Sequence, residues 1–277
     1  LRKLKIRPTQ KADNYTWLRR VYLVTIGRIP NKQEIHDYIA NRDSKKKDRV
    51  IRELLSSPGH VSQQLNWVSD ILRVKDRLDG VNINTGGVYR EYIRQQLHNN
   101  VPWDIFVSNL IDNTGDLFGG NPAAGYYLRD RGMQQDNIAH TVQIFLGTRL
   151  ECAMCHNHPF DRWTQKEFYQ MTAFTSGIGG VTIRNRRRAL QDLNRMISRD
   201  GSPQAGKYQN WRNVVRDSIQ FGVDTNGTGK IKLTDEFMED DAKPGDMLHA
   251  EAMFTPHIYI DPKDNNPRSL TVLAKWL

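Results

Sequence analysis

The chain has 277 residues, of which 38% are hydrophobic and 26% are charged, and its formal net charge is +9. Apolar and aromatic residues are spread along the whole chain, which excludes a collagen-like, coiled-coil or wholly disordered protein. No run approaches the ~18 apolar residues of a membrane-spanning helix, so a protein that does not span a membrane is expected. The basic charge favours an anionic partner, such as an anionic glycan or an acidic protein. No nucleic-acid recognition motif accompanies the charge, so no specific nucleic-acid partner is expected.

Helical spacing of apolar residues continues from the N-terminal end to about residue 175. The first helix is expected over Tyr15–Ile26. Asn31 is placed to cap a second helix, with Glu34 positioned to complete a capping box. Further helices are expected around the apolar groups Val50–Leu55, Leu65–Leu72, Val88–Leu97, Ile105–Leu110 and Ile138–Leu150, the last of them capped by Asp136.

The pattern changes after Ser176. Short strands are expected at Val181–Ile183, Gly229–Leu233, Ala252–Phe254 and His257–Ile260, with a loop at Asp200–Gly206. We therefore predict a mainly α fold: a helical N-terminal domain (1–176), followed by a smaller mixed α/β region with short strands (177–265). Residues 266–277 end within an apolar helical pattern and are interpreted as the start of a truncated following domain.

The segment that carries the chemistry runs from Cys152 to Trp163 and contains Cys-x-x-Cys-His, the attachment signature of c-type haem. Two thiols three positions apart can each add to one haem vinyl group, and the following His156 can supply an axial imidazole to the iron. Cys152 and Cys155 are also the only cysteines of the chain. One covalently attached haem c is therefore the expected cofactor.

Three other interpretations of the motif remain open. The cysteines could form a plain thiol pair or disulfide, or a thioredoxin-like dithiol, although no βαβ pattern precedes them. Cys152, Cys155, His156 and His158 could also bind zinc, but four ligands within seven residues crowd one tetrahedral site.

Residues around the motif receive subsidiary roles. His158 lies too close to His156 to reach the opposite face of a haem, so it is expected to hydrogen-bond to Asp161 or to a propionate. Phe160 and Trp163 are candidates for the walls of a haem pocket. The distal iron ligand is expected from outside the motif, with His140 and Met171 as first candidates, or the position is open.

Residues 152–169 resemble the hallmark of the large secreted "planctomycete cytochrome" family, and Leu18–Leu23, Asn121–Tyr126 and Asp240–Asp246 are further similar stretches. Pro267–Leu277 is similar to the opening of the domain that usually follows in that family. The resemblance implies export, and thus a periplasmic, secreted or cell-surface location, together with a helical N-terminal domain and haem c. It supplies no substrate, because the activity of the family is largely uncharacterised.

Two functions follow. The first is an exported c-type haem protein that transfers electrons to a redox partner, or that forms the haem module of a larger redox assembly. The alternative is an extracellular structural or interaction module whose Cys-His cluster holds zinc or no cofactor. The chain contains no G-x-S-x-G or H-E-x-x-H motif, so the sequence indicates no hydrolase site. An enzymatic redox role stays open if haem is present.

The segment Asp224–Ile231 resembles the start of an EF-hand calcium loop, with Asp, Asn and Thr at the first, third and fifth positions. The twelfth position is Asp235 instead of the bidentate glutamate, and no helical pattern follows. A turn that leads into a strand is therefore favoured over a calcium site.

Overall fold

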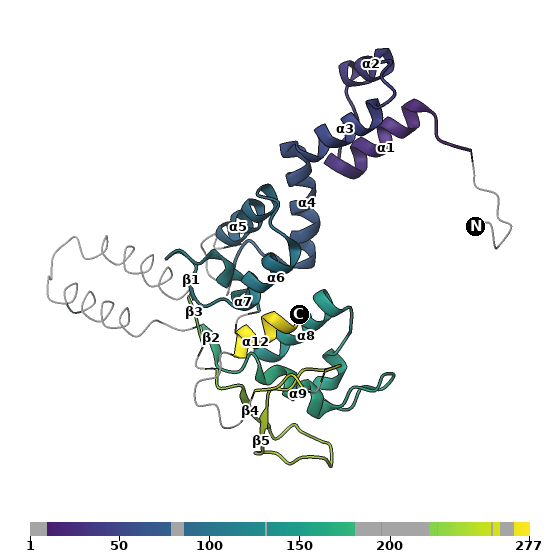
Figure 1. Cartoon of the computed structure of the whole chain (residues 1–277). Coiled ribbons are helices and arrows are strands. Elements are labelled where there is room, and N and C mark those ends of the chain that lie inside the picture. The colour runs from purple at the N-terminus through teal and green to yellow at the C-terminus, as the bar shows by residue number, and fades with distance from the viewer. Residues whose placement is uncertain are drawn as a thin grey trace.

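The protein is described by a computed structural model covering residues 10–78, 86–130, 132–180, 195, 222–225, 227–255, 257–260 and 269–277 (Figure 1). Helices dominate these residues and the strands are short, which confirms the predicted mainly α fold with a small mixed region. None of the helices in the described ranges combines the length and apolar character needed to cross a membrane.

The first helices form a group at one end of the molecule, α1 (Asn14–Ile26), α2 (Lys32–Ala40) and α3 (Lys46–Leu55), which α4 (Pro58–Ile71) joins to the rest (Figure 1). The predicted capping box is present: the Glu34 amide donates to the Asn31 side chain and the Asn31 amide donates to the Glu34 carboxylate. This group has its own small core of Leu18, Tyr22, Tyr38 and Leu54.

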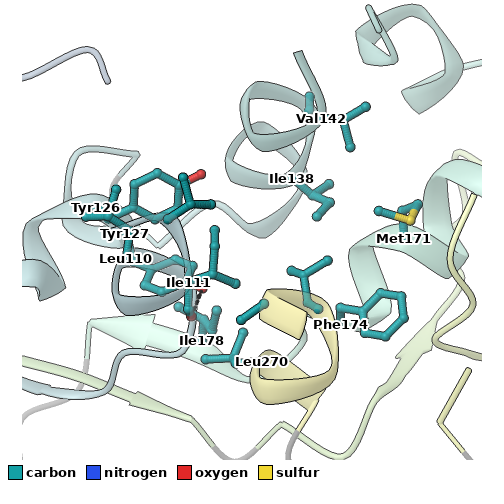
Figure 2. Close-up of a cluster of buried hydrophobic side chains, with 14 of the residues drawn as sticks. Leu110, Ile111, Tyr126, Tyr127, Ile138, Val142, Met171, Phe174, Ile178 and Leu270 are labelled. Atoms are coloured by element: carbon teal, nitrogen blue, oxygen red, sulfur yellow. Dashed lines mark hydrogen bonds between the residues drawn. The ribbon is translucent and has the colours of Figure 1, made fainter. Parts of the chain in front are cut away.

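The larger core lies among the later helices α5 (Gly86–His98), α6 (Trp103–Ile111), α7 (Gly125–Leu128), α8 (Gln134–Leu146), α9 (Gln165–Ala173) and α12 (Ser269–Trp276), with the 3-10 turns η1 (Pro122–Ala124) and η2 (Glu151–Met154). Figure 2 shows part of this cluster, in which Leu270 of α12 lies near Ile111 of α6. Hydrophobic residues from both sides of position 176 thus share one core. The domain boundaries expected at 176 and 265 stay a prediction.

Asp136 does not cap α8. The N-cap residue is Met133, and Asp136 lies in the first turn of the helix. There its carboxylate interacts favourably with the positive end of the helix dipole, which is a second reason why acidic residues gather near helix starts.

Short antiparallel strands follow the helices. β1 (Gly115–Asp116), β3 (Gly222–Thr225) and β2 (Ile178–Gly180) form one sheet in that order, and β4 (Lys230–Lys232) pairs with β5 (Met247–His249). The strand expected at Gly229–Leu233 is confirmed as β4. The strands expected at Ala252–Phe254 and His257–Ile260 are replaced by a turn closed by a single bridge between Glu251 and Tyr259, because Phe254 adopts a left-handed φ of 66°. Val181–Ile183 and Asp200–Gly206 lie outside the described residues.

Candidate functional site

Cys152 lies in the short 3-10 turn η2 and Cys155 is the C-cap residue of that turn, which packs against both α8 and α9. Ala153 is buried and anchors η2 to the core, whereas Cys152 and Cys155 are exposed free thiols. Side chains three positions apart eclipse one another in a 3-10 helix, and Cys155 caps η2 three positions after Cys152, so this spacing is suited to placing both thiols on one exposed face.

His156 follows directly and is exposed. Its Nδ1 lies 2.6 Å from the carbonyl oxygen of Asn157. A hydrogen bond to a carbonyl places the imidazole proton on Nδ1, which leaves the Nε2 lone pair free to bind a metal. The ring is therefore in the tautomer that an axial ligand requires.

The rest of the loop folds back on itself. The His158 amide donates to the Trp163 carbonyl at 2.8 Å, and His158 Nδ1 accepts from the Phe160 amide at 3.2 Å. Asp161 accepts from the Arg162 amide, so the structure pairs both His158 and Asp161 with neighbouring backbone amides. These bonds shape the turn that follows the motif.

The two aromatic residues of the loop lie in different environments. The Phe160 side chain is 94% exposed, while Trp163 is only 3% exposed and packs edge-on against Phe254 with ring centroids 4.9 Å apart. The Arg162 guanidinium lies over the Trp163 ring. Trp163 therefore fixes the loop to the protein, and Phe160 offers an exposed apolar surface on the same loop.

Sequence reasoning missed a buried side chain that organises the motif. Gln165 is fully buried, and its Nε2 donates to the Met154 carbonyl at 3.1 Å and lies 3.4 Å from the Glu236 carbonyl. Its Oε1 accepts from the Met238 amide at 3.0 Å, and its own amide donates to Asn157 Oδ1 at 2.9 Å. One glutamine thus joins the motif loop to a segment more than seventy positions later.

A second bond to that segment comes from Glu239, whose carboxylate accepts from the Asn157 amide at 2.9 Å. Met238, the residue before it, has a side chain that is 76% exposed. Spacing in the sequence gives no signal for Glu239, because its contact with Asn157 spans 82 positions.

Met171 lies inside the core. Its side chain is fully buried in the cluster of Figure 2, and its sulfur accepts from the Met253 amide at 3.3 Å. The thioether is therefore already engaged on the interior side of α9.

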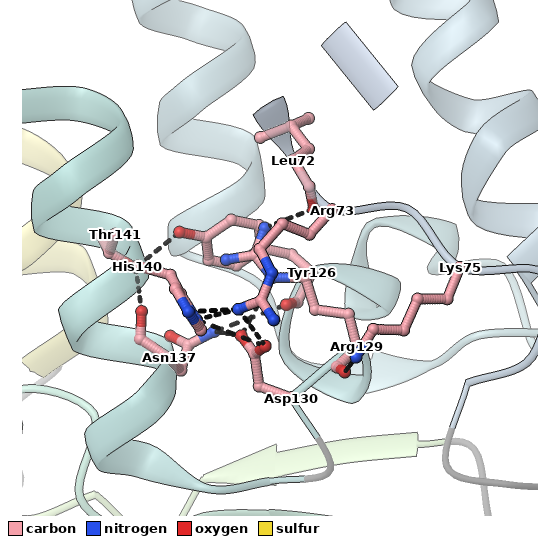
Figure 3. A network of polar contacts seen from close by, with 9 residues as sticks. All are labelled: Leu72, Arg73, Lys75, Tyr126, Arg129, Asp130, Asn137, His140 and Thr141. Carbon is pink, nitrogen blue, oxygen red and sulfur yellow. Dashed lines mark hydrogen bonds and ion pairs between the residues drawn. The ribbon is translucent and has the colours of Figure 1, made fainter. Parts of the chain in front are cut away.

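His140, the other distal candidate, belongs to a polar network between α8 and the end of α4 (Figure 3). Its Nδ1 lies 3.6 Å from Asp130 Oδ1, and the Arg73 guanidinium contacts both the ring and Asp130. Burial lowers the pKa of His140, while the Asp130 charge opposes that shift and Arg73 adds to it. The ring is thus held as a neutral member of this network.

The deeper part of the network is a buried ion pair. Arg129 is 1% exposed and donates from Nε to Asp130 Oδ2 at 3.0 Å, and Asn137 donates to the same oxygen at 3.1 Å. Arg129 Nη1 also donates to the Leu72 carbonyl at 2.7 Å. Within the described part of the chain, its Nη2 has no hydrogen-bond partner.

The other metal sites considered from the sequence are not assembled in the described ranges, where no three His, Cys, Asp or Glu side chains come together as a metal cluster. In the EF-hand-like segment, Asp224 and Thr225 lie in β3 and pair with β2, and Asn226 is outside the described residues.

Fold and site together define a mainly helical protein that presents a Cys-x-x-Cys-His loop at its surface. Residues 1–179 match the family model described as PSCyt2, protein of unknown function (DUF1549), and the chain belongs to this family. The predicted resemblance to the planctomycete cytochrome family is thereby confirmed. Searches of curated proteins and of solved structures gave no match.

Proposed function

We propose that this protein is an exported c-type haem protein, in which Cys152 and Cys155 hold one haem through thioether bonds and His156 ligates the iron. One observation carries the proposal: an exposed free thiol in η2 and a second at its C-cap are followed at once by an exposed imidazole whose Nδ1 faces a backbone carbonyl. This donor set fits haem c, whose attachment needs two accessible thiols and one basic nitrogen. The haem supplies one-electron redox chemistry when bound.

The chain's own residues provide the support for such a group. Trp163 holds the loop against the protein, and the exposed Phe160 ring supplies apolar surface on the loop that follows the thiols. A large aromatic side chain left in water is unfavourable, so covering Phe160 would favour binding of a flat apolar ligand. A cytochrome-type family name supports a periplasmic or cell-surface location and a redox partner or a larger redox assembly.

The distal position is proposed to be open. The Met171 sulfur is buried and bonded to a backbone amide, and His140 is engaged with Asp130 and Arg73. Both distal candidates therefore have competing interactions within the fold. Reduced protein should then bind carbon monoxide, and a reduced spectrum unchanged by the gas would eliminate the open position.

The proposal is tested by intact-mass measurement and a pyridine-haemochrome spectrum, on native protein or on protein expressed with haem-attachment machinery. The wild-type mass should exceed that of the polypeptide by one haem, and Cys152→Ala/Cys155→Ala should lose this increment. His156→Ala should keep the haem covalently attached but change its spin state, because the proximal nitrogen is lost. His36→Ala, which removes an exposed histidine on α2, is the control and should keep the wild-type spectrum.

A wild-type chain without the mass increment would refute the haem assignment. Stoichiometric zinc without iron in that protein would instead favour the extracellular structural or interaction module.

A further inference from the structure

Two hydrogen bonds bracket the pair Cys155–His156, which would supply the second thioether and the axial imidazole. Gln165 holds the carbonyl of Met154, immediately before the pair, at 3.1 Å. Glu239 holds the amide of Asn157, immediately after the pair, at 2.9 Å. The exposed pair is thus fixed at both of its backbone ends.

Both holding side chains are tied to the same later segment, 236–239. Glu239 belongs to it, and Gln165 accepts from the Met238 amide at 3.0 Å. The bond from Asn157 ends on a carboxylate, and hydrogen bonds to an ionised acceptor are about twice as strong as neutral ones. The Gln165 side chain is fully buried and its hydrogen bonds are part-buried, so water competes for them less than for bonds at the open surface.

We propose that Gln165 and Glu239 are positioning residues that fix Cys155 and His156 for haem attachment and ligation, an inference that rests on the proposed function. A metal ligand is effective only when its orientation is held by surrounding contacts, and the Cys155 and His156 side chains are themselves exposed. Segment 236–239 lies beyond the family-matched residues 1–179, so the later region completes the site.

The test compares Glu239→Ala, Glu239→Gln and Gln165→Ala with the wild type. Asp241→Ala is the matched control, because its carboxylate lies on the same stretch of chain but faces Lys166 at 4.0 Å. The first measurement needs no haem: amide hydrogen exchange at Asn157 in the apo chain. Glu239→Ala should accelerate this exchange by about tenfold, which is the scale of one charge-assisted hydrogen bond, while the control variant leaves it unchanged.

The second measurement is the visible and electron paramagnetic resonance spectrum of the haem-loaded chain. Glu239→Ala should give a mixture of iron spin states because His156 is no longer held in one orientation. Glu239→Gln keeps an acceptor oxygen and should restore a single ligation state. Because Gln165 is fully buried, its variant can fail to fold, and the half-buried Glu239 therefore provides the decisive pair.

The outcomes separate the two hypotheses. Wild-type protein without covalent haem refutes the proposed function and the positioning role with it. Haem-loaded Glu239→Ala with wild-type exchange at Asn157, or with faster exchange but an unchanged spectrum, overturns the positioning role and leaves the proposed function standing.

Discussion

Removing the carboxylate of Asp130 should be among the most destabilising single changes in the protein. Asp130 is 4% exposed and neutralises Arg129, which is 1% exposed and pairs with no other carboxylate among the described residues. Asp130→Ala therefore leaves a guanidinium in the interior, held by the Leu72 carbonyl but without a counter-charge. Breaking a buried ion pair from one side costs about 3–5 kcal/mol, which lowers Tm by roughly 10 °C in a chain of this size.

The assay is urea unfolding followed by far-ultraviolet circular dichroism. The double variant Arg129→Met/Asp130→Asn should cost less than Asp130→Ala alone, because it removes the charge together with its partner. Asp76→Ala is the surface control: Asp76 pairs with exposed Arg90, and its loss should cost at most about 1 kcal/mol. An Asp130→Ala cost below about 1 kcal/mol, or a larger cost for the double variant, would refute the reasoning.

Three further predictions concern stability. Burial lowers the pKa of His140 in the folded state, so the unfolded state binds more protons between about pH 6.5 and the lower folded-state pKa. The stability contributed by the neutral ring is therefore lost as the pH falls from about 6.5 through the folded-state pKa. His140→Asn should lose less stability than the wild type between about pH 7.5 and about pH 5.5 in parallel urea titrations, and equal losses would contradict this. Gly125→Ala should cost about 1–3 kcal/mol in thermal unfolding, because the added methyl group meets the buried Tyr89 ring, and a stability gain would show that this contact relaxes freely. Thr164→Ala removes the side-chain cap of α9 and should cost about 1 kcal/mol; no measurable change in urea unfolding would argue that the capping box with Glu167 contributes nothing.

Most of the helices could be predicted from patterns local in the sequence, such as apolar periodicity and capping residues. The helix after Asn31 could be predicted because a capping box and the apolar periodicity lie within one short stretch. The prediction of two strands between Ala252 and Ile260 was wrong, because the backbone at Phe254 is left-handed and forms a turn. Phenylalanine rarely adopts this conformation, so the sequence does not indicate the turn. β1 also escaped prediction: it is two residues long and pairs with a strand more than one hundred positions later.

The candidate site also has a part that local sequence patterns predict and a part that depends on distant contacts. The thiols and the following imidazole are contiguous in sequence, so the motif alone could indicate them. Phe160 and Trp163 look equivalent in the sequence, yet one is exposed and the other is buried, because burial depends on the remote Phe254 ring. Gln165 and Glu239 could not be identified from the sequence, since the contacts that tie the motif loop to the later segment span 71–82 positions.

The two histidines show why the fold matters for ligand choice. His156 is exposed, and its Nδ1 bonds to the neighbouring Asn157 carbonyl, which leaves Nε2 available as a ligand. His140 faces Asp130 and Arg73, so using it as an iron ligand would require it to leave a network built on the buried Arg129 pair. Removing one partner from such a buried network destabilises the fold by more than a single exposed contact stabilises it. His140, which sequence position made a candidate ligand, is thus held in a network that stabilises the fold. His156, which follows Cys155 directly, is the imidazole that stays available as a ligand.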